Sequence, residues 1–483
     1  MTLPLFTTST NGYTLILGLG ETGLAAAHWY LRQALPIRLA DTRLGSQKVI
    51  DELCGQYEVV AVEAVLGSDA LASSVLDSVQ TVVISPGLAM TDEAVAALLI
   101  EAEARRIRVI SEMELFAQAL VDLSNTGYVP KVLAVTGTNG KTTVTQMVKH
   151  IAQEAGLKTV AAGNISPAAI TALIRALDSN DLPDIWVIEL SSFQLVHTFS
   201  LPVLASVVLN ISQDHIDWHG NMAAYAAAKA RLYGMSELAI FNRDDVETKA
   251  LTNQFESKPV QSFGLSMAPT PRDLGVVEHQ GQQWISTSDE YLLPVAALLI
   301  MGKHNLSNAL AALCLTQAAG IDWQPAVSVL RSYYGEPHRC QFIRSIQGVD
   351  FINDSKGTNV GATVAAIEGL SRPLVLIMGG VAKGQDFTPV AAALSQRVCR
   401  AVMLIGQDAP LIAAALGTAE VEAQVLTNLE DAVESAFAFA LRGDIVLFSP
   451  ACASFDMFAN YIQRGERFVA AVNELALDQG EVV

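Results

Sequence analysis

The 483-residue sequence has few cysteines and no long apolar run. Its five cysteines are odd in number and scattered, without a C-x-x-C pair, which excludes a disulfide framework and a cysteine metal or redox motif. The longest apolar run, residues 292–301, contains a proline and is far shorter than the roughly 20 residues that cross a bilayer. We therefore expect a globular protein without a membrane-spanning segment.

Positive charge is also scarce, because 30 basic residues face 49 acidic ones and give a net charge of −19. This excess repels polyanions and excludes general binding to nucleic acid or to an anionic membrane surface, so any phosphate site has to be local. The opening residues, MTLPLFTTST, lack a basic start and a continuous apolar stretch. That composition argues against a secretory signal and predicts a cytoplasmic location.

What the sequence does contain is a phosphate-loop pattern, VLAVTGTNGKTT, at residues 132–143. An apolar strand-like segment runs into glycines, a lysine and threonines, and a helical pattern follows from Val144. Such a loop, with a helix N-terminus behind it, favours the phosphates of a nucleotide. Lys141 would reach the β- and γ-phosphates and Thr142 would bind Mg²⁺. The loop is a variant, since Val135 stands where the usual pattern has its first glycine.

The beginning of the chain follows a strand–turn–helix pattern that predicts a parallel sheet. Residues 13–17 are expected to form a strand, the turn GLGETG follows, and residues 24–33 are expected to form a helix. The next predicted strand ends at Asp41, which is the arrangement of a dinucleotide-binding turn. This motif alone leaves a nucleotide role and a turn that serves only packing equally open. Ser85-Pro86-Gly87 follows a further predicted strand, at the edge where open α/β sheets bind ligands.

Polar residues also follow predicted strands later in the chain. Glu189 ends the strand at residues 184–188, where a Mg²⁺ ligand is expected beside a phosphate loop, although an acid that caps the next turn is a serious alternative. His215 follows the strand at 204–209, and Lys229 lies on a helix at 225–232. Neither residue would be selected on its own merits, because such residues are most often capping or solvated.

We interpret the chain as α/β with three domains: a Rossmann-like domain at residues 1–119, a central phosphate-loop domain with a mostly parallel sheet at 120–335, and a Rossmann-like α/β domain at 336–483. Residues 120–130 are predicted to be a linker, and Gly335-Glu336-Pro337 marks the second boundary. In the third domain, polar or glycine-rich loops follow the predicted strands 349–352, 374–378 and 445–448. These three loops should face one edge of the sheet.

Eight motifs in this order resemble the Mur ligases of bacterial cell-wall synthesis: TGTNGKTT, ELSSFQL, the N-x-S-x-D-H-x-D run, AAKxRxY, HNxxNAL, PHR, NDSKGTN and SPACASFDMF. The resemblance covers essentially the whole chain. The last three motifs, with Asp41-Thr42-Arg43, are similar to the member that adds D-glutamate to UDP-N-acetylmuramoyl-L-alanine. Two departures are Ser166, where glycine is expected, and Tyr461, where the family can have phenylalanine.

The resemblance implies a role for each site residue. Residues for the UDP-sugar substrate would be Gly20, Glu21, Thr22, Gly23, Asp41, Thr42, Arg43, Ser85, Pro86, Gly87, Asn164 and Ser191. Residues for ATP would be Gly137, Thr138, Asn139, Gly140, Lys141, Thr142, Thr143, Asn305, Asn308, Arg339, Asp354 and Lys356. D-glutamate would meet Thr358, Lys383, Ser454, Phe455 and Tyr461. Metal ligands would be Thr142, Glu189, His215 and Lys229, and the catalytic set would be Lys141, His215 and Lys229.

The reaction implied by the resemblance is an ATP-dependent ligation through an acyl phosphate, with ATP and two Mg²⁺ ions, and with Lys229 carbamylated. The expected partners are UDP-N-acetylmuramoyl-L-alanine, D-glutamate and ATP, without nucleic acid or membrane, and the expected state is a monomer. Three alternatives are a sister or folylpolyglutamate-type ligase, a non-catalytic nucleotide-binding module, and an NAD oxidoreductase. The set of Lys141, Thr142, Glu189, His215 and Lys229 argues against the binding module, and a second phosphate loop against the oxidoreductase.

Overall fold

The computed structural model describes residues 12–57, 61–255, 257–300, 302–370, 372–417 and 421–481. The opening ten residues and Met301, both interpreted above, lie outside these ranges. The chain divides into two compact units. The first unit comprises residues 1–277, 285–292 and 310–329, and the second comprises 278–284, 293–309 and 330–483. Within the described ranges, no helix has both the length and the apolarity to span a membrane.

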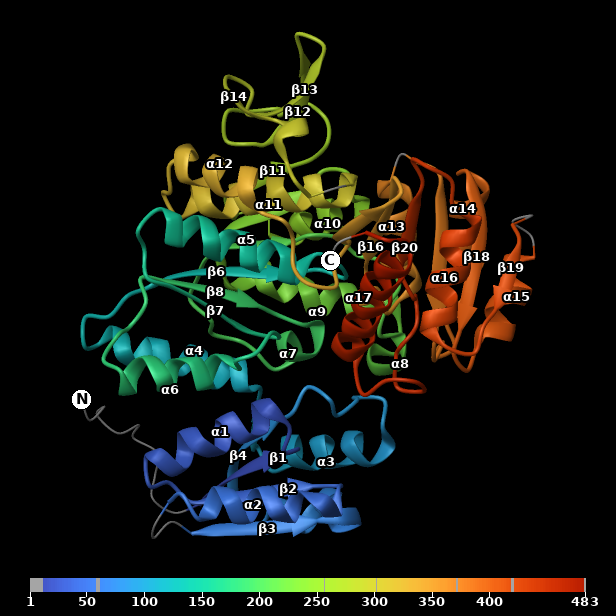
Figure 1. The fold of residues 1–483 in the computed structure, drawn as a ribbon. Coiled ribbons are helices and arrows are strands. Elements are labelled where there is room, and N and C mark those ends of the chain that lie inside the picture. The colour runs from blue at the N-terminus through green and yellow to red at the C-terminus, as the bar shows by residue number, and fades with distance from the viewer. Residues whose placement is uncertain are drawn as a thin grey trace. The chain divides into compact units, whose positions relative to one another are not determined.

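The beginning of the first unit is a five-stranded parallel sheet with the order β3-β2-β1-β4-β5 (Figure 1). Its strands are β1 (Tyr13–Leu17), β2 (Ile37–Asp41), β3 (Val62–Leu66), β4 (Val79–Ile84) and β5 (Arg108–Ile110). Its helices are α1 (Glu21–Arg32), α2 (Gln47–Cys54), α3 (Glu93–Ala104) and α4 (Glu112–Ser124). β1 lies between β2 and β4, so the glycine turn after β1 is at the switch point of the sheet, where α/β folds bind ligands.

The same unit continues with a six-stranded sheet of order β11-β10-β9-β6-β8-β7, whose strand pairs are all parallel. The strands are β6 (Lys131–Thr136), β7 (Thr159–Gly163), β8 (Ile185–Glu189), β9 (Val203–Val208), β10 (Ser236–Asn242) and β11 (Val260–Phe263). The helices are α5 (Lys141–Glu154), α6 (Ala169–Asp178), α7 (Ser192–Val196), α8 (Ile216–His219), α9 (Met222–Met235) and α10 (Val246–Thr252). β6, which leads into the phosphate loop, is central, and it is buried on both faces, as its apolar sequence requires.

Residues 275–332 form a small sheet and two helices. The sheet has the order β12-β13-β14, with β12 (Gly275–His279), β13 (Gln282–Ser286) and β14 (Tyr291–Pro294). Helices α11 (Lys303–Ala318) and α12 (Trp323–Ser332) follow.

The second unit contains a six-stranded sheet of order β15-β16-β20-β17-β18-β19, which is parallel except for the pair of β15 and β16. Its strands are β15 (Gln341–Ile346), β16 (Val349–Asn353), β17 (Leu374–Gly379), β18 (Cys399–Ile405), β19 (Ala423–Val425) and β20 (Ile445–Phe448). Its helices are α13 (Val360–Gly369), α14 (Thr388–Ser395), α15 (Ala409–Leu416), α16 (Leu429–Phe439) and α17 (Tyr461–Asp478). β16, β20 and β17 are neighbours, so the loops after them share one edge of the sheet, as predicted.

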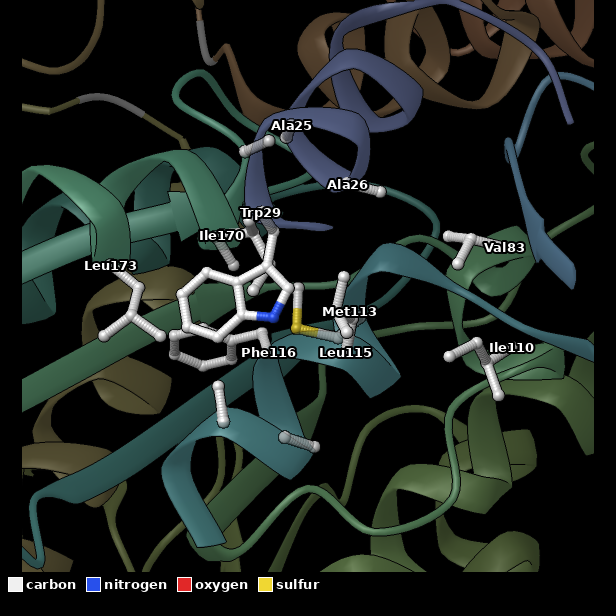
Figure 2. Packing of buried hydrophobic residues seen from close by; sticks show 14 of the residues in the cluster. Ala25, Ala26, Trp29, Val83, Ile110, Met113, Leu115, Phe116, Ile170 and Leu173 are labelled. Atoms are coloured by element: carbon white, nitrogen blue, oxygen red, sulfur yellow. The ribbon is translucent and has the colours of Figure 1, made fainter. Parts of the chain in front are cut away.

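One hydrophobic core joins the two sheets of the first unit. Figure 2 shows the Trp29 indole of α1 among Met113 and Phe116 of α4 and Ile170 and Leu173 of α6. Trp29 is 1% exposed, and truncating such a residue to alanine costs about 3 to 5 kcal/mol. The linker prediction is partly wrong, because residues 120–124 belong to α4. The apolar positions of α4 keep it helical into this core, and only 125–130 are irregular.

Candidate active site

The phosphate loop connects the buried strand β6 to α5. Gly137 and Gly140 have φ angles of +152° and +85°, and a side chain at Gly137 would lie 2.9 Å from Cβ of Leu209. Asn210, at the end of β9, fixes the loop. Its backbone oxygen accepts from the N–H of Thr138 (3.0 Å), and its Oδ1 accepts from the N–H of Asn139 (2.8 Å). These two N–H groups are therefore engaged, and an anion at this loop would meet the first turn of α5.

Two lysines converge on one carbonyl group in the phosphate loop. Lys141 Nζ donates to the backbone oxygens of Gly137 and Thr138, both at 2.8 Å, and Lys229 Nζ donates to the same Gly137 oxygen at 3.0 Å. Lys229 is 2% exposed and its Nζ lies 4.6 Å from the centre of the Tyr225 ring. Burial, and secondarily the charge of Lys141, hold the pKa of Lys229 well below its usual value. The charged form of Lys229 is thus disfavoured relative to that of an exposed lysine.

Glu189, at the end of β8, is 1% exposed. Its Oε1 accepts from Asn164 Nδ2 at 2.8 Å, whereas its Oε2 is buried and has no hydrogen-bond partner among the described residues. A buried carboxylate oxygen without a partner is costly, and a cation would satisfy it. Ser191 caps α7, with its Oγ accepting from the N–H of Gln194 at 3.2 Å. Asn164 therefore orients the Glu189 carboxylate, and Ser191 caps α7. The two residues follow β7 and β8, at the edge of the sheet where Glu189 lies.

His215 lies in an aromatic cluster beside the lysine pair. It adopts a left-handed backbone (φ +55°) at the start of α8, and its ring centre is 4.6 Å from that of Phe193. Its Nε2 is 3.5 Å from the Asp214 carboxylate. Burial lowers the pKa of His215 and Asp214 opposes the shift. Thr138 Oγ1 and the Tyr225 hydroxyl are 2.9 Å apart, which ties the phosphate loop to α9.

The turn after β1 is held by Asp41. This carboxylate is 3% exposed and accepts from the N–H of Leu19 at 2.7 Å and from the N–H and guanidinium of Arg43 at 2.7 to 2.9 Å. The bonds from the Arg43 side chain lower the pKa of Asp41 to about 2. A side chain at Gly23 would lie 1.9 Å from the Gly18 oxygen, so only glycine fits there. The sequence predicted Asp41 as a ligand residue, and the structure shows it bound to Arg43.

The other predicted residues of this turn lie close to it. Ser85 Oγ donates to the Gly18 oxygen at 3.2 Å and lies 3.4 Å from Thr22 Oγ1, so the turn and the loop after β4 meet. Glu21 Oε1 accepts from the N–H of Ala168 at 3.1 Å, at the start of α6. Thr42 and Gly87 are exposed, and Gly20 and Pro86 are half-buried.

In the second unit, Asp354 is the centre of the predicted nucleotide-facing group. Its oxygens accept from Ser449 Oγ at 2.7 Å and from the N–H of Cys340 at 3.2 Å. Burial raises the pKa of Asp354 to about 6, and the charge of Arg339 opposes the shift. Lys356 Nζ lies 3.9 Å from the centre of the Tyr461 ring.

Of the residues predicted to meet D-glutamate, four come from the loops after β16, β17 and β20, and Tyr461 is the first residue of α17. The N–H of Thr358 donates to the Lys356 oxygen at 2.8 Å, and Ser454 is 3% exposed. Lys383 has φ +53°, and its Nζ lies 5.8 Å from the ring centre of Phe455, which is 70% exposed. On α11, Asn308 Nδ2 donates to Asn305 Oδ1 at 3.2 Å, and both residues are 7% exposed.

Sequence reasoning missed Arg464, which organises these loops. It is 1% exposed and donates to Ser355 Oγ (3.0 Å), the Ser355 oxygen (2.7 Å) and the Cys452 oxygen (3.0 Å). It thereby joins the loops after β16 and β20 to α17. Asn210 and Tyr225 were missed as well. Asn210 directly follows a predicted strand, which was a usable signal, whereas an arginine within a helix gives none.

Comparison with known proteins places the chain in a family. Three family models match successive segments: "Mur ligase MurD-like, N-terminal domain" at residues 12–111, "Mur ligase middle domain" at 135–316, and "Mur ligase, glutamate ligase domain" at 338–452. The chain therefore belongs to the Mur ligase family. The α/β architecture predicted from the sequence is confirmed.

The chain is similar along nearly its whole length to curated members of this family. It is 49% identical to the UDP-N-acetylmuramoylalanine–D-glutamate ligase of Bordetella avium, over 97% of each chain. It is 45% identical to the enzyme of that name from Ralstonia nicotianae, over 97% of this chain and 98% of the relative. Among solved structures, the UDP-N-acetylmuramate–alanine ligase of Thermotoga maritima shares the fold, with a TM-score of 0.56 at 17% identity over 96% of this chain and 99% of that one.

Proposed function

We propose that the chain is an ATP-dependent ligase that joins D-glutamate to UDP-N-acetylmuramoyl-L-alanine and releases ADP and phosphate, in the synthesis of the peptidoglycan precursor. The observation that carries this proposal is the identity of 49% over 97% of both chains to an enzyme of that name. The presence of the phosphate loop, Glu189 and the lysine pair at adjoining strand ends supports an enzyme rather than a binding module. We place the reaction in the cytoplasm, where ATP is available, and a monomer stays a prediction.

The proposed reaction has two steps. The alanyl carboxylate of the UDP-sugar attacks the γ-phosphorus of ATP, forming an acyl phosphate while ADP leaves. The amine of D-glutamate then attacks the acyl carbon, phosphate leaves, and the amine loses a proton. Because two anions meet in the first step, the main requirement is neutralisation of charge. Lys141, at the start of α5, would exchange its loop carbonyls for phosphate oxygens.

The chain's own residues fit a cation at this site. Thr142 and Glu189 would hold one Mg²⁺, because Glu189 Oε2 is buried without a partner in the described structure. His215 and Lys229 would support a second. Mg²⁺ supplies charge neutralisation between the approaching anions. We propose that Lys229 is carbamylated: its amine, whose charged form burial disfavours, would add to CO₂, lose a proton and become an anion beside the phosphate loop.

We assign each part of the substrates to residues near the ends of strands or at the start of helices. We assign the turn after β1 and the Ser85 loop to the UDP portion, and Asn164 and Ser191 to the muramoyl-alanine end. We assign Asn305, Asn308, Arg339, Asp354 and Lys356 to the nucleotide. Thr358, Lys383, Ser454, Phe455 and Tyr461 are assigned to D-glutamate. This assignment is supported by the adjacency of β16, β20 and β17, because the loops after neighbouring parallel strands lie at one edge of the sheet.

The test is phosphate release from purified protein with ATP, Mg²⁺ and UDP-N-acetylmuramoyl-L-alanine, across a panel of D- and L-amino acids. Release that depends on D-glutamate is expected. Equal release with another amino acid, or release that ignores D-glutamate, would overturn the assignment.

A further inference from the structure

The side-chain amide of Gln385 lies among the three loops to which we assign D-glutamate. Gln385 follows β17 and is half-buried. Its Oε1 accepts from the N–H of Val360 at 2.9 Å, and its Nε2 donates to the backbone oxygens of Ala382 (3.0 Å) and Ala451 (3.1 Å). Val360 begins α13, after β16, and Ala451 follows β20. One side chain therefore joins the loops after β16, β17 and β20.

The bond to Val360 holds one end of the loop that carries Thr358. The N–H of the first residue of a helix has no partner within the helix, and Gln385 Oε1 supplies one. At the other end of the loop, Arg464 donates to the Ser355 side chain and backbone oxygen. Thr358 therefore lies between two anchored residues, and loss of the Gln385 amide would remove one of the two anchors.

The bonds to Ala382 close the turn that carries Lys383. The N–H and the Nε2 of Gln385 both donate to the Ala382 oxygen, at 3.2 and 3.0 Å. The two residues between them, Lys383 and Gly384, have φ angles of +53° and +71°. This left-handed conformation is strained for a lysine, so the surrounding hydrogen bonds have to hold it. The Gln385 side chain therefore helps to set the direction of Lys383.

The bond to Ala451 ties the same turn to the loop that carries Ser454. The backbones of these two loops are already paired, because the N–H of Val381 donates to the Ala453 oxygen at 2.9 Å and the N–H of Ala453 donates to the Val381 oxygen at 3.0 Å. Gln385 adds a side-chain bond to this pairing and extends the connection to the start of α13.

We propose that Gln385 is a positioning residue: it holds the three loops at fixed separations and thereby sets the affinity for the amino-acid substrate. Thr358, Lys383 and Ser454 come from different loops, so their spacing depends on contacts between the loops. Groups that are already in place bind a ligand more tightly than groups that have to be ordered at the moment of binding. This inference rests on the proposed function, which supplies the amino acid and its contact residues.

The test is Gln385→Glu, which keeps the size of the side chain and an acceptor for Val360 but places an anionic oxygen against the oxygens of Ala382 and Ala451. The KM of D-glutamate should rise about 3- to 10-fold, the value of one neutral hydrogen bond. The kcat at saturating D-glutamate and the KM values of ATP and of the UDP-sugar should stay unchanged. A side chain that served only stability would lower the active fraction, and hence kcat, without changing one KM selectively.

Two further variants keep the test decisive. Gln385→Ala removes the amide without adding charge, should raise the same KM, and carries the test if Gln385→Glu does not fold. Gln396→Glu, at the exposed end of α14, adds the same charge to the same domain and should leave all three KM values at those of the parent. If neither Gln385 variant raises the KM of D-glutamate, or if the three KM values rise together, the proposal is overturned.

Hydrogen exchange separates this inference from the proposed function, because it does not require turnover. In Gln385→Ala, backbone exchange followed by mass spectrometry should be faster than in the parent at the start of α13 and in the turn at 382–385, and equal in the sheet of β1 to β5. If exchange responds in this way but D-glutamate supports no phosphate release, the positioning of the loops stands and the proposed function falls. If D-glutamate supports release while exchange and its KM are unaffected by Gln385→Ala, the proposed function stands and this inference falls.

Discussion

At the scale of single residues, the most informative contact is the Gly137 carbonyl, to which both Lys141 and Lys229 donate. In a chain of net charge −19, Lys141 lies at the start of α5, where a triphosphate would bind, and Lys229 is buried beside it. Two like charges at one oxygen repel each other, and the buried member yields its proton more readily. Burial therefore distinguishes the two lysines, because it disfavours the charged form of Lys229, while Lys141 lies partly exposed at the start of α5.

Replacing the cation tests the phosphate-loop assignment. Lys141→Ala should lower the rate of phosphate release by about 10³-fold, a typical loss for a group that stabilises transition-state charge. Binding of UDP-N-acetylmuramoyl-L-alanine, measured by calorimetry, should remain. Lys149→Ala, further along α5, is the control and should be neutral. Loss of both activity and UDP-substrate binding in Lys141→Ala would contradict the division of the substrates between loops.

Replacing the amine tests carbamylation. Lys229→Ala should be nearly inactive, because the proposed carbamate on its Nζ cannot form, and small carboxylates such as acetate or formate should restore part of the rate by occupying the vacated space. The measurement is phosphate release against carboxylate concentration. Lys141→Ala should show no such rescue, since it lacks a cation. A flat response of Lys229→Ala at all concentrations would remove the support for a carbamate.

At the scale of elements, the apolar runs predicted the strands well. The strands predicted at 13–17 and 445–448 coincide with β1 and β20. Parallel strands are buried on both faces, so their sequences are continuous and easy to detect. The linker prediction was wrong at residues 120–124, because Leu120 and Leu123 are buried and keep this segment in α4.

The candidate site was only partly visible from sequence. Motif residues at strand ends could be predicted because parallel strands end at one edge. The sequence could not predict which of these residues form hydrogen bonds with each other. The contacts of Asp41 with Arg43 and of Glu189 with Asn164 depend on side-chain geometry. Arg464 acts through three oxygens from segments distant in sequence, and no local pattern reports such contacts.

Arg464 gives the prediction at this scale. Arg464→Lys should lower stability by about 2 to 4 kcal/mol, since a compact ammonium cannot serve all three oxygens and a buried charge is left incompletely paired. It should also raise the KM of D-glutamate several-fold and leave binding of the UDP substrate unchanged. Thermal unfolding and steady-state kinetics measure these effects. Arg467→Lys, on the same helix with a 59% exposed side chain, should change neither. Equal behaviour of the two variants would contradict the proposed organising role.

At the scale of the molecule, the two sheets of the first unit share the hydrophobic core around Trp29. Two carboxylates accept hydrogen bonds from N–H groups at the start of α6 and reinforce this junction. Glu112 Oε1 accepts from the N–H of Ile170 at 2.6 Å, and Glu21 Oε1 accepts from Ala168. Negative charge at a helix N-terminus is favourable, but Glu112 is 2% exposed and its Oε2 has no partner in the described structure.

Burial raises the pKa of Glu112 from 4.5 to about 7, with a further small contribution from Glu21. The folded state thus retains this proton better than the unfolded state does. The resulting stabilisation is fully present below pH 4.5 and is lost as the pH rises through 7.

Glutamine at this position can keep the bond to Ile170 and cannot ionise. Between pH 4 and 8.5, the free energy of unfolding of Glu112→Gln should therefore improve relative to the parent by about 3 kcal/mol. Urea unfolding followed by tryptophan fluorescence across this range measures the difference, and Glu103→Gln, an exposed site on α3, should give curves parallel to the parent. Parallel curves for Glu112→Gln as well would mean that Glu112 ionises without cost, and that the junction is held by apolar packing alone.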